Sequence, residues 1–408
     1  MMNLYIFYES NRSAIYGIGT YIRELTYALK NSDINLCVIH LRSGKPNVEI
    51  QMSEGVRYLY IPLPANLSAN NPDWYWMCDS YYSNVMYLLK LYIKNTESLV
   101  FHLNYNTCFS LADELKKTFD CKIIMAVHYF EWCFTLLGNI TQFRKILNFP
   151  NDNINLESIR DFYRKEKKLF ETVDNIVCLS KKTRDILEFD YQINQKKISV
   201  IYNGLTDSHA APDKPELLKK YHIPDIPIIL FAGRLDRIKG LAYAIKAFKI
   251  VLNVQPACHF IIAGNGAFDA YMKECEDIWT HVTWTGLILR EKLFDLYSIA
   301  DIGVIPSFHE QCSYVAMEMM MHGLPVIGST TTGLEEMIVD GETGWHIPVM
   351  EFDDSAEIDP SLLTEKILYL LQHTEKRRIM GMNARKRYEE LYSSEVMTEN
   401  MLNFYKSL

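Results

Sequence analysis

The sequence predicts an α/β protein with two doubly wound parallel sheets, each covered by helices on both faces. Short apolar runs of strand length alternate with amphipathic stretches of helical period along the chain. A polar, proline-containing stretch after Asn203-Gly204 interrupts this alternation, which begins again near Ile226. With 408 residues the chain also exceeds what one hydrophobic core usually supports, which favours two domains.

Residues 1–204 are expected to form the first domain. The apolar runs that predict its strands are Leu4–Phe7, Leu36–Leu41, Val56–Ile61, Leu99–Leu103, Lys122–Val127, Asn175–Leu179 and Ile198–Ile201. The amphipathic stretches that predict its helices are Thr20–Leu29, Ser110–Lys117, Ile159–Phe170 and Lys181–Leu187.

Residues 205–385 are expected to form the second domain. Its predicted strands are Ile228–Ala232, His259–Ala263, Val282–Trp284, Ile302–Ile305 and Pro325–Gly328. Its first helix is predicted by Leu241, Ile245, Phe248 and Leu252, which share one face of a 3.6-residue period. Helices are expected near 361–373, 375–392 and 395–405, and residues 386–408 are expected to pack back toward the first domain.

Composition narrows the class of protein. A net charge of -8 without a long Lys/Arg run argues against nucleic acid as the main partner. Nine cysteines without C-x-x-C spacing indicate free thiols in a reducing cytosol, not a disulfide framework or a zinc site. No signal peptide or run of about 18 apolar residues is visible, so we expect a cytoplasmic protein that is soluble or sits on a membrane face.

The stretch from Asp301 to Ile338 organises the second domain. It combines a buried strand, a polar break and a helix from Ser313 to His322, and it contains Glu310 and Glu318 with seven residues between them. Where a parallel strand ends and a helix begins, unpaired amides attract anions and ligands bind. We therefore expect Glu310 at the mouth of a ligand crevice and Glu318 on its helical wall. The alternative is an ordinary strand, loop and Met-rich core helix.

The loop Phe231–Gly240 carries two cations between a predicted strand and a predicted helix. Gly233 allows a tight backbone turn, and Arg234 and Lys239 converge with the free amides at the helix start. A diphosphate suits this arrangement because its charge needs more than one donor. The alternative is a pair of solvated surface cations.

Two weaker signals lie in the first domain, where Gly17-Ile18-Gly19 opens the first helix and His128 follows a predicted strand. A lone G-x-G is weak evidence, and a histidine at a strand end is as often a satisfied structural residue as a ligand. The second G-x-G, at 264–266, lacks the third glycine of a dinucleotide fingerprint because that position is Asp269. A classical NAD site is therefore not expected.

Several motifs resemble the retaining GT-B glycosyltransferases of the E-x7-E type, the family 4-like or group 1 enzymes. In the second half these are G-R-L-x3-K-G at 233–240, P-S-x2-E at 306–310, E-x7-E at 310–318, H-G-L-P-V-I-G at 322–328 and D-G-E-T-G-W at 340–345. In the first half they are Gly17-Ile18-Gly19 with Tyr21 and Leu25, the His128 strand end, Ser180 at a helix start and Val200–Gly204. The resemblance implies two Rossmann-like domains facing a central cleft.

The resemblance also implies roles for the site residues. Arg234 and Lys239 would bind the donor diphosphate and stabilise it as it leaves. Glu310 would face the transferring sugar, and Glu318 would hold the ribose. Backbone amides of Ser313, Tyr314 and Val315 would bind the donor together with Gly233. The acceptor side would be lined by Gly17, Gly19 and His128, and Gly19 would also contact the donor. The family position that Glu336 occupies has no settled role.

The implied reaction is front-face transfer with retention, without a metal or other cofactor. The donor would be a UDP- or GDP-linked sugar, and the acceptor a glycan, a lipid-linked saccharide or another hydroxyl compound. No Asp-x-Asp occurs in the sequence, in keeping with the family.

Two departures from the family pattern concern the donor loop and the linker. Where the family has E-G-F-G, this chain has Glu310-Gln311-Cys312-Ser313, which predicts closer approach to the sugar or altered sugar choice. The family Asp that follows Asn-Gly is Thr206 here, with Asp207 one residue later.

An aromatic stretch and a basic run leave two interpretations open. The stretch 70–92 is rich in Trp and Tyr. In one interpretation the aromatic residues form a platform for a sugar and the basic run forms a helix face on a membrane. In the other, the aromatic residues belong to the core and the basic run is a solvated helix face. The basic run consists of Arg160, Arg164, Lys165, Lys167 and Lys168.

The function expected from these observations is a glycosyltransferase that builds a surface or secreted glycan from the cytosolic side. A sugar-nucleotide epimerase would not explain the set Arg234, Lys239, Glu310 and Glu318. A catalytically impaired donor-binding or scaffolding subunit is the alternative that the altered donor loop supports.

Overall fold

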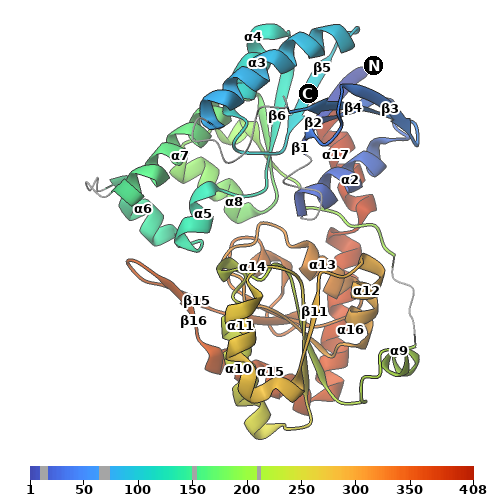
Figure 1. Cartoon of the computed structure of the whole chain (residues 1–408), viewed down its shortest axis with the longest axis vertical. Helices are drawn as coiled ribbons and strands as arrows, with labels where there is room; N and C mark the ends of the chain where they lie inside the picture. The colour runs from blue at the N-terminus through green and yellow to red at the C-terminus, as the bar shows by residue number, and fades with distance from the viewer. Residues whose placement is uncertain (10–16, 64–73, 149–153, 209–212) are drawn as a thin grey trace. The chain divides into compact units, whose positions relative to one another are not determined.

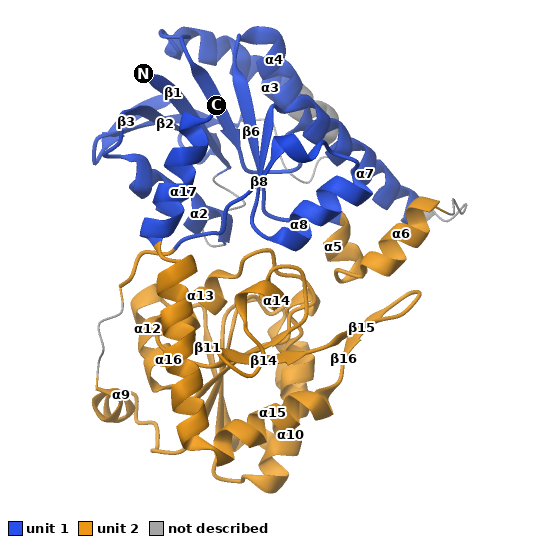
Figure 2. Cartoon of the chain, turned by 180° about the vertical axis from the view of Figure 1, so that it is seen from behind, with its two compact units in different colours: residues 1–131, 152–204, 394–408 blue, residues 132–151, 205–393 orange. Residues whose placement is uncertain are grey.

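The structure is a computed structural model that describes residues 1–9, 17–63, 74–148, 154–208 and 213–408, without the side chains of 74–79 and 154–155. The chain divides into two compact units (Figure 2). The first contains residues 1–131, 152–204 and 394–408, and the second contains 132–151 and 205–393.

The first unit is built on an eight-stranded sheet in the order β3-β4-β2-β1-β5-β6-β7-β8. All neighbouring strands are parallel except β3 and β4, which form an antiparallel pair at one edge. The strands are β1 (Met2–Glu9), β2 (Ile34–Ser43), β3 (Glu49–Ser53), β4 (Val56–Pro62), β5 (Leu99–Leu103), β6 (Lys122–Val127), β7 (Asn175–Cys178) and β8 (Ile198–Val200).

Helices cover both faces of this sheet, as expected for strands that are apolar along their whole length (Figure 1). Helices α2 and α17 pack against each other, and α4 packs against both α3 and α7. The helices are α2 (Gly17–Leu29), α3 (Trp74–Tyr92), α4 (Phe109–Thr118), α7 (Ile154–Thr172), α8 (Lys181–Asp185), the π-helix η1 (Ile186–Asp190), the short 3-10 helix η2 (Gln195–Lys197) and α17 (Ser394–Lys406).

The second unit is built on a six-stranded parallel sheet in the order β11-β10-β9-β12-β13-β14. The strands are β9 (Ile228–Ala232), β10 (His259–Ala263), β11 (Val282–Gly286), β12 (Ile302–Ile305), β13 (Val326–Ser329) and β14 (Gly344–Ile347). A separate antiparallel hairpin consists of β15 (Val349–Glu351) and β16 (Ala356–Ile358).

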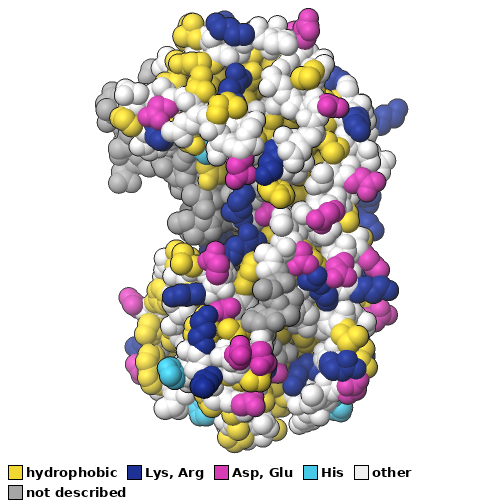
Figure 3. Space-filling view, turned by 90° about the vertical axis from the view of Figure 1, so that its right-hand side faces the viewer, with side chains coloured by type: hydrophobic (Ala, Val, Ile, Leu, Met, Phe, Trp, Pro, Cys, Tyr) yellow, Lys and Arg dark blue, Asp and Glu magenta, His cyan; other side chains and the backbone are white. Residues whose placement is uncertain are grey.

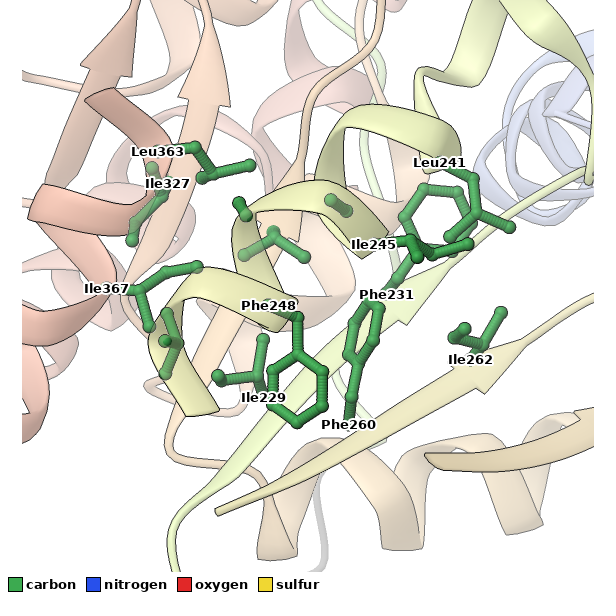
Figure 4. Packing of buried hydrophobic residues seen from close by; sticks show 14 of the residues in the cluster. Ile229, Phe231, Leu241, Ile245, Phe248, Phe260, Ile262, Ile327, Leu363 and Ile367 are labelled. Atoms are coloured by element: carbon green, nitrogen blue, oxygen red, sulfur yellow. The ribbon is translucent and has the colours of Figure 1, made fainter. Parts of the chain in front are cut away.

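The helices of the second unit follow its strands along the chain. They are α9 (Lys214–Lys220), the 3-10 helix η3 (Arg237–Lys239), α10 (Leu241–Val254), α11 (Phe268–Glu274), the 3-10 helix η4 (Glu276–His281), α12 (Arg290–Ile299), α13 (Tyr314–Met321), α14 (Leu334–Met337), α15 (Pro360–Gln372) and α16 (Thr374–Leu391). The buried core lies where α10 covers β9 and β10, with Phe231, Phe248 and Phe260 at its centre (Figure 4).

The helices α5 (Glu131–Leu136) and α6 (Ile140–Asn148) lie in the first half of the sequence, yet residues 132–151 belong to the second unit. The side-chain amide of Asn139 donates to the carbonyls of Phe352 and Ser355, at 2.7 Å each. The Glu351 carboxylate accepts from the amide of Thr141 at 3.0 Å, at the positive end of α6. These contacts bind α6 to the β15–β16 hairpin.

The strands expected from apolar runs are all present, and their bounds agree to within about two residues. The expected helix 181–187 is divided into α8 and the π-helix η1. The compact units divide the chain differently from a single boundary at 204, because 132–151 lies in the second unit and only 394–408 returns to the first. The elements that were not expected are the helices α3, α5, α6, α9, α11, α12 and α14 and the strands β3, β14, β15 and β16.

Two further features bear on the composition. The cysteines whose side chains are described are all free thiols. No helix among the described residues combines the length and the apolar character that crossing a bilayer requires.

Candidate active site

Two loops lie side by side at the carboxyl ends of β9 and β12, which are neighbouring parallel strands. The Phe308 amide donates to the carbonyl of Ile238 at 2.7 Å and so joins the two loops. Gly240, between η3 and α10, has a φ of 68°, and a Cβ there would lie 1.8 Å from the Pro306 carbonyl oxygen. Only glycine permits this close approach, which brings the end of η3 next to Ser307–Glu310.

Lys239 and Glu310 meet at this junction, although 71 positions separate them in the sequence. Their side chains form an ion pair of 2.6 Å, and the Ser307 hydroxyl donates to the same carboxylate oxygen at 2.9 Å. The side chains are only 20% and 12% exposed, so the pair is partly withdrawn from water. Two residues that sequence motifs assigned to the diphosphate and to the sugar are therefore in direct contact.

Arg234 lies in the same loop but has different neighbours. Its guanidinium pairs with Asp236 at 3.2 Å and lies 6.0 Å from the ring centre of Phe134, in α5. Gly233, with a φ of 150°, donates its amide to the carbonyl of Ala263 at 2.9 Å and so fixes the start of the loop against β10. The loop thus presents two cations, each balanced by one carboxylate.

Glu318 lies on α13 and is almost buried. Its carboxylate accepts a hydrogen bond from the Tyr297 hydroxyl at 2.8 Å and is 3.6 Å from the guanidinium Nε of Arg290. Burial, followed by the charge of Glu318, raises the pKa of Tyr297 well above its ordinary value. Tyr297 and Arg290 carry no sequence motif, so the sequence did not reveal them as partners of Glu318.

Ser313 is the N-cap of α13, since its hydroxyl accepts from the amide of Ala316 at 3.4 Å. Its own amide, expected to bind the donor, instead donates to the thioether of Met337 at 3.2 Å. Tyr314 and Val315 occupy the first turn of the helix, as expected. A thioether is a weak acceptor, so the Ser313 amide remains a weakly held donor group.

His128 and the glycines of the first helix belong to the first unit. His128 Nε2 lies 3.1 Å from the side-chain oxygen of Asn104, whose amide nitrogen donates to the carbonyl of Phe7. Burial, with a smaller effect of His102, lowers the pKa of His128 to about 3, so the ring is neutral and Nε2 donates.

The side chain of Tyr21 connects the start of α2 with this histidine. Tyr21, two residues after Gly19, packs edge-on against the His128 ring with centroids 4.6 Å apart. Gly17 is the first residue of the helix, as the sequence predicted. The first unit therefore groups Gly17, Gly19 and His128, and the second unit holds the other predicted site residues.

The remaining predicted positions have structural partners. The Asp207 carboxylate pairs with Arg385 of α16, and the carbonyl of Glu336 accepts from Arg387 at 2.7 Å. Among the described residues, no three His, Cys, Asp or Glu side chains gather in a way that could hold a metal ion.

The basic run on α7 is balanced by acidic neighbours. Arg164 and Lys165 pair with Glu157 and Asp161, and Lys168 pairs with Asp113 at 2.9 Å. Figure 3 shows the side that is on the right in Figure 1, away from α7, and basic and acidic side chains are interspersed over that face as well. In the aromatic stretch Tyr81 and Tyr82 are buried, while the side chains of Trp74, Tyr75 and Trp76 lie outside the described residues.

Comparison with known proteins places both halves of the chain. Residues 15–209 match the family model "Glycosyltransferase Family 4" and residues 213–387 match "Glycosyl transferases group 1". The capsular polysaccharide biosynthesis glycosyltransferase CapM of Staphylococcus aureus is 24% identical over 67% of this chain and 74% of its own. The alpha-D-kanosaminyltransferase of Streptomyces kanamyceticus is 24% identical, and the match spans 57% of this chain and 60% of that protein.

Solved structures share the fold over the whole chain. The sucrose-phosphate synthase of Thermosynechococcus elongatus superposes with a TM-score of 0.77 at 20% identity, covering 100% of this chain and 99% of its own. Anabaena HepE, solved with UDP and glucose, gives 0.74 at 14% identity with 100% coverage of both chains. The GT-B fold class expected from the sequence is thereby confirmed. The chain belongs to the GT-B glycosyltransferases that the group 1 and family 4 models describe.

Proposed function

We propose that this protein is a retaining, metal-independent hexosyltransferase that moves a sugar from a nucleotide diphosphate donor to a hydroxyl acceptor. The observation that carries the proposal is the 2.6 Å contact between Lys239 and Glu310 at the carboxyl ends of neighbouring strands. Arg234 in the same loop supplies the second cation that a diphosphate requires.

The chemistry assigns a separate task to each group. As the bond between the anomeric carbon and the diphosphate oxygen breaks, its electron pair passes to the leaving diphosphate. Lys239 and Arg234 stabilise that charge, and preorganised groups of this kind are typically worth several kcal/mol. The acceptor oxygen bonds to the same face of the sugar, and its proton passes to the departing phosphate oxygen. Glu310, next to Lys239, would face the sugar.

Glu318 is proposed to hold the ribose hydroxyls, with Arg290 and Tyr297 fixing its carboxylate. Gly233 and the amides at the start of α13, those of Ser313, Tyr314 and Val315, are proposed to complete the donor site. Gly17, Gly19 and His128 are proposed for the acceptor and sugar side, since His128 directly follows β6 and Tyr21 of α2 packs against its ring. The neutral His128 would act as a hydrogen-bonding group and not as a cation.

The relatives suggest the class of substrate. CapM is named for capsular polysaccharide biosynthesis, and HepE was solved with UDP and glucose, which supports a UDP-linked donor and surface glycan synthesis here. We propose a cytosolic site of action. Peripheral membrane contact stays a prediction, to which the ion-paired basic residues of α7 add no support.

A donor-binding or scaffolding subunit is the second candidate, favoured by Gln311 and Ser313 where the family has glycines. Neither residue has a positive φ, so the loop accommodates both without backbone strain. Binding of a donor without hydrolysis or transfer, across a broad acceptor set, would favour this candidate.

The test is a thermal-shift panel of UDP, GDP, ADP and their common sugars. A ligand at 100 times its Kd stabilises by about 2.7 kcal/mol, which gives a clear shift. The shift should disappear in Arg234→Ala/Lys239→Ala. The matched control is Arg237→Ala/Lys246→Ala, which removes the same charge from two exposed side chains of η3 and α10. The proposal fails if no nucleotide stabilises the wild type or if both double variants lose the shift equally.

A further inference from the structure

The loop that carries Glu310 is fastened to the segment after β13 by a row of hydroxyl groups. Ser329, Thr331 and Thr332 donate to the carbonyl oxygens of Ser307, Phe308 and Glu310, respectively. The amide of Gly333 also donates to the Glu310 carbonyl, at 2.6 Å. Glu310 is thus held at its backbone by two donors and at its carboxylate by Lys239 and Ser307.

His309, the residue before Glu310, is buried and contacts Thr332 and Gln311, with 7% of the residue exposed. Its Nδ1 is 3.2 Å from the Thr332 hydroxyl, and its Nε2 is 3.4 Å from the side-chain nitrogen of Gln311. The distances join Gln311, His309 and Thr332 into one chain of contacts that ends at the backbone of Glu310.

The direction of these hydrogen bonds follows from counting protons. The Thr332 hydroxyl has one hydrogen and donates it to the Glu310 carbonyl at 2.7 Å. His309 Nδ1 must therefore carry the proton that the Thr332 oxygen accepts. Nε2 is then the acceptor, and the amide nitrogen of Gln311 is its donor. Each group uses a donor or acceptor that it possesses, so the chain is self-consistent from Gln311 to Glu310.

The charge state of His309 agrees with this assignment. Burial lowers its pKa to about 4, while the charge of Glu310 acts in the opposite direction and Lys239 reinforces the fall. A neutral imidazole has one donor and one acceptor, as the chain requires. An imidazolium would present two N–H donors, and the contact with the Gln311 amide nitrogen would then be repulsive.

We propose that His309 is a positioning residue for Glu310, linked through Thr332 to its backbone and locked in one tautomer by Gln311. The proposal rests on the proposed transfer function for its catalytic consequence. It also gives the altered donor loop a role. A glycine at position 311 has no side chain, whereas the Gln311 side chain donates a hydrogen bond to His309 and so holds the loop in place. Gln311 and His309 would thus act together to hold Glu310 relative to the sugar.

The first test concerns catalysis. In His309→Leu the Nδ1 donor and the Nε2 acceptor are both lost, and small displacements of a reacting group can reduce the rate by roughly 10- to 100-fold. We expect kcat to fall by about that factor, with little change in donor KM, because Arg234 and Lys239 still bind the diphosphate. His309→Asn should restore much of kcat, since its amide nitrogen can replace Nδ1 as the donor to Thr332.

The matched control is His259→Leu, which removes another histidine that contacts a threonine hydroxyl in the same unit, at 2.8 Å from Thr283. Its kcat should equal that of the wild type. The proposal is overturned if His309→Leu retains wild-type kcat, or if His309→Asn is as impaired as His309→Leu.

The second test does not depend on turnover. Nitrogen-15 NMR of histidine-labelled protein, with His309→Asn used for assignment, should show His309 protonated on Nδ1 from pH 5 to 8. An Nε2–H tautomer, or titration of His309 near pH 6.5, would overturn the proposed hydrogen-bond chain from Gln311 through His309 and Thr332 to Glu310. If the wild type turns over no donor, the proposed function fails, and this spectrum alone decides whether the hydrogen-bond chain exists.

Discussion

Glu166 is a fully buried carboxyl group on α7, surrounded by hydrogen-bond donors. Its oxygens accept from the side-chain amide of Asn106 at 2.9 Å, from the backbone amide of Glu131 at 3.0 Å and from the hydroxyl of Tyr191. Burial nevertheless dominates and raises its pKa to about 7. Because Glu131 lies three residues after His128, Glu166 helps to fix the segment that follows that histidine.

We predict that Glu166→Gln removes a pH dependence of stability. A pKa raised from 4.5 to about 7 means that the folded protein holds the proton more tightly than the unfolded chain. This stabilisation, roughly 3 kcal/mol, is complete below pH 4.5 and is lost as the pH rises through 7. Glutamine does not ionise, and like the protonated carboxyl group it has one carbonyl acceptor, for Asn106 and the Glu131 amide, and one donor, for the Tyr191 hydroxyl oxygen. Urea unfolding should therefore show the variant equal to the wild type at pH 5 and more stable at pH 8.

Glu171→Gln, at an exposed position on the same helix, is the control for removing a carboxylate from α7. It should follow the wild-type profile across the range. A difference between Glu166→Gln and the wild type that stays constant from pH 5 to 8 would contradict the assigned pKa.

At the scale of single residues, the sequence singled out Arg234, Lys239, Glu310 and Glu318 as candidate site residues because their motifs have a fixed spacing. It did not predict that Lys239 and Glu310 touch, since such a contact depends on which strands are neighbours in the sheet. His309 was missed for the same reason. Its position beside Glu310 was visible, but its partner Thr332 lies 23 positions away on the segment after another strand.

At the scale of elements, Gly240 connects η3 to α10 and allows the loop after β9 to lie against the loop after β12. We predict that Gly240→Ala destabilises the second unit much more than Gly286→Ala does. Both glycines have φ between 60° and 70°, but a Cβ meets the Pro306 carbonyl in the first case and nothing within 4 Å in the second. Alanine in a left-handed conformation costs about 1 kcal/mol, whereas the Gly240 variant must also move backbone and should lose more than about 3 kcal/mol.

Guanidinium unfolding of the two variants, followed by the fluorescence of the tryptophans in the second unit, measures this difference. The control shares the conformational cost, so the excess loss in Gly240→Ala reports the close approach alone. Equal losses in the two variants would show that Pro306 and the loop adapt without cost.

The strands were predictable because parallel strands buried on both faces are continuously apolar, as at Leu99–Leu103. Edge and hairpin strands lack that signal. β3 is exposed along most of its length, and β15 has only three residues, two of them exposed, so neither has an apolar run to find. Helix α6 was missed although it is amphipathic, because its apolar side chains are few and its partner is a hairpin more than 200 residues later.

At the scale of the whole molecule, the chain crosses between its compact units more than once, which sequence patterns do not encode. The boundary near 204 was visible as a change in composition. Residues 132–151 belong to the second unit, where Asn139 contacts the Phe352 carbonyl and Glu351 contacts the Thr141 amide. Both contacts involve single polar side chains, and neither has a local pattern that would identify its partner.

The return of α17 to the first unit gives the last prediction. Met397, Met401, Phe404 and Tyr405 are buried on this helix, which packs against α2. The Tyr405 hydroxyl also lies 2.7 Å from His102 Nδ1, in β5. Deletion of residues 394–408 should therefore expose apolar surface on α2 and leave His102 without this partner.

Hydrogen exchange measured by mass spectrometry locates the effect. Exchange should accelerate in α2 and β5 of the deletion variant, while α10, in the core of the second unit, keeps its wild-type rate. Tyr405→Phe, which removes only the hydroxyl, should reproduce the change in β5 in milder form, because one buried hydrogen bond contributes about 1 kcal/mol. Faster exchange in α10 with α2 unchanged would mean that α17 stabilises the second unit instead, and the assignment of 394–408 to the first unit would be wrong.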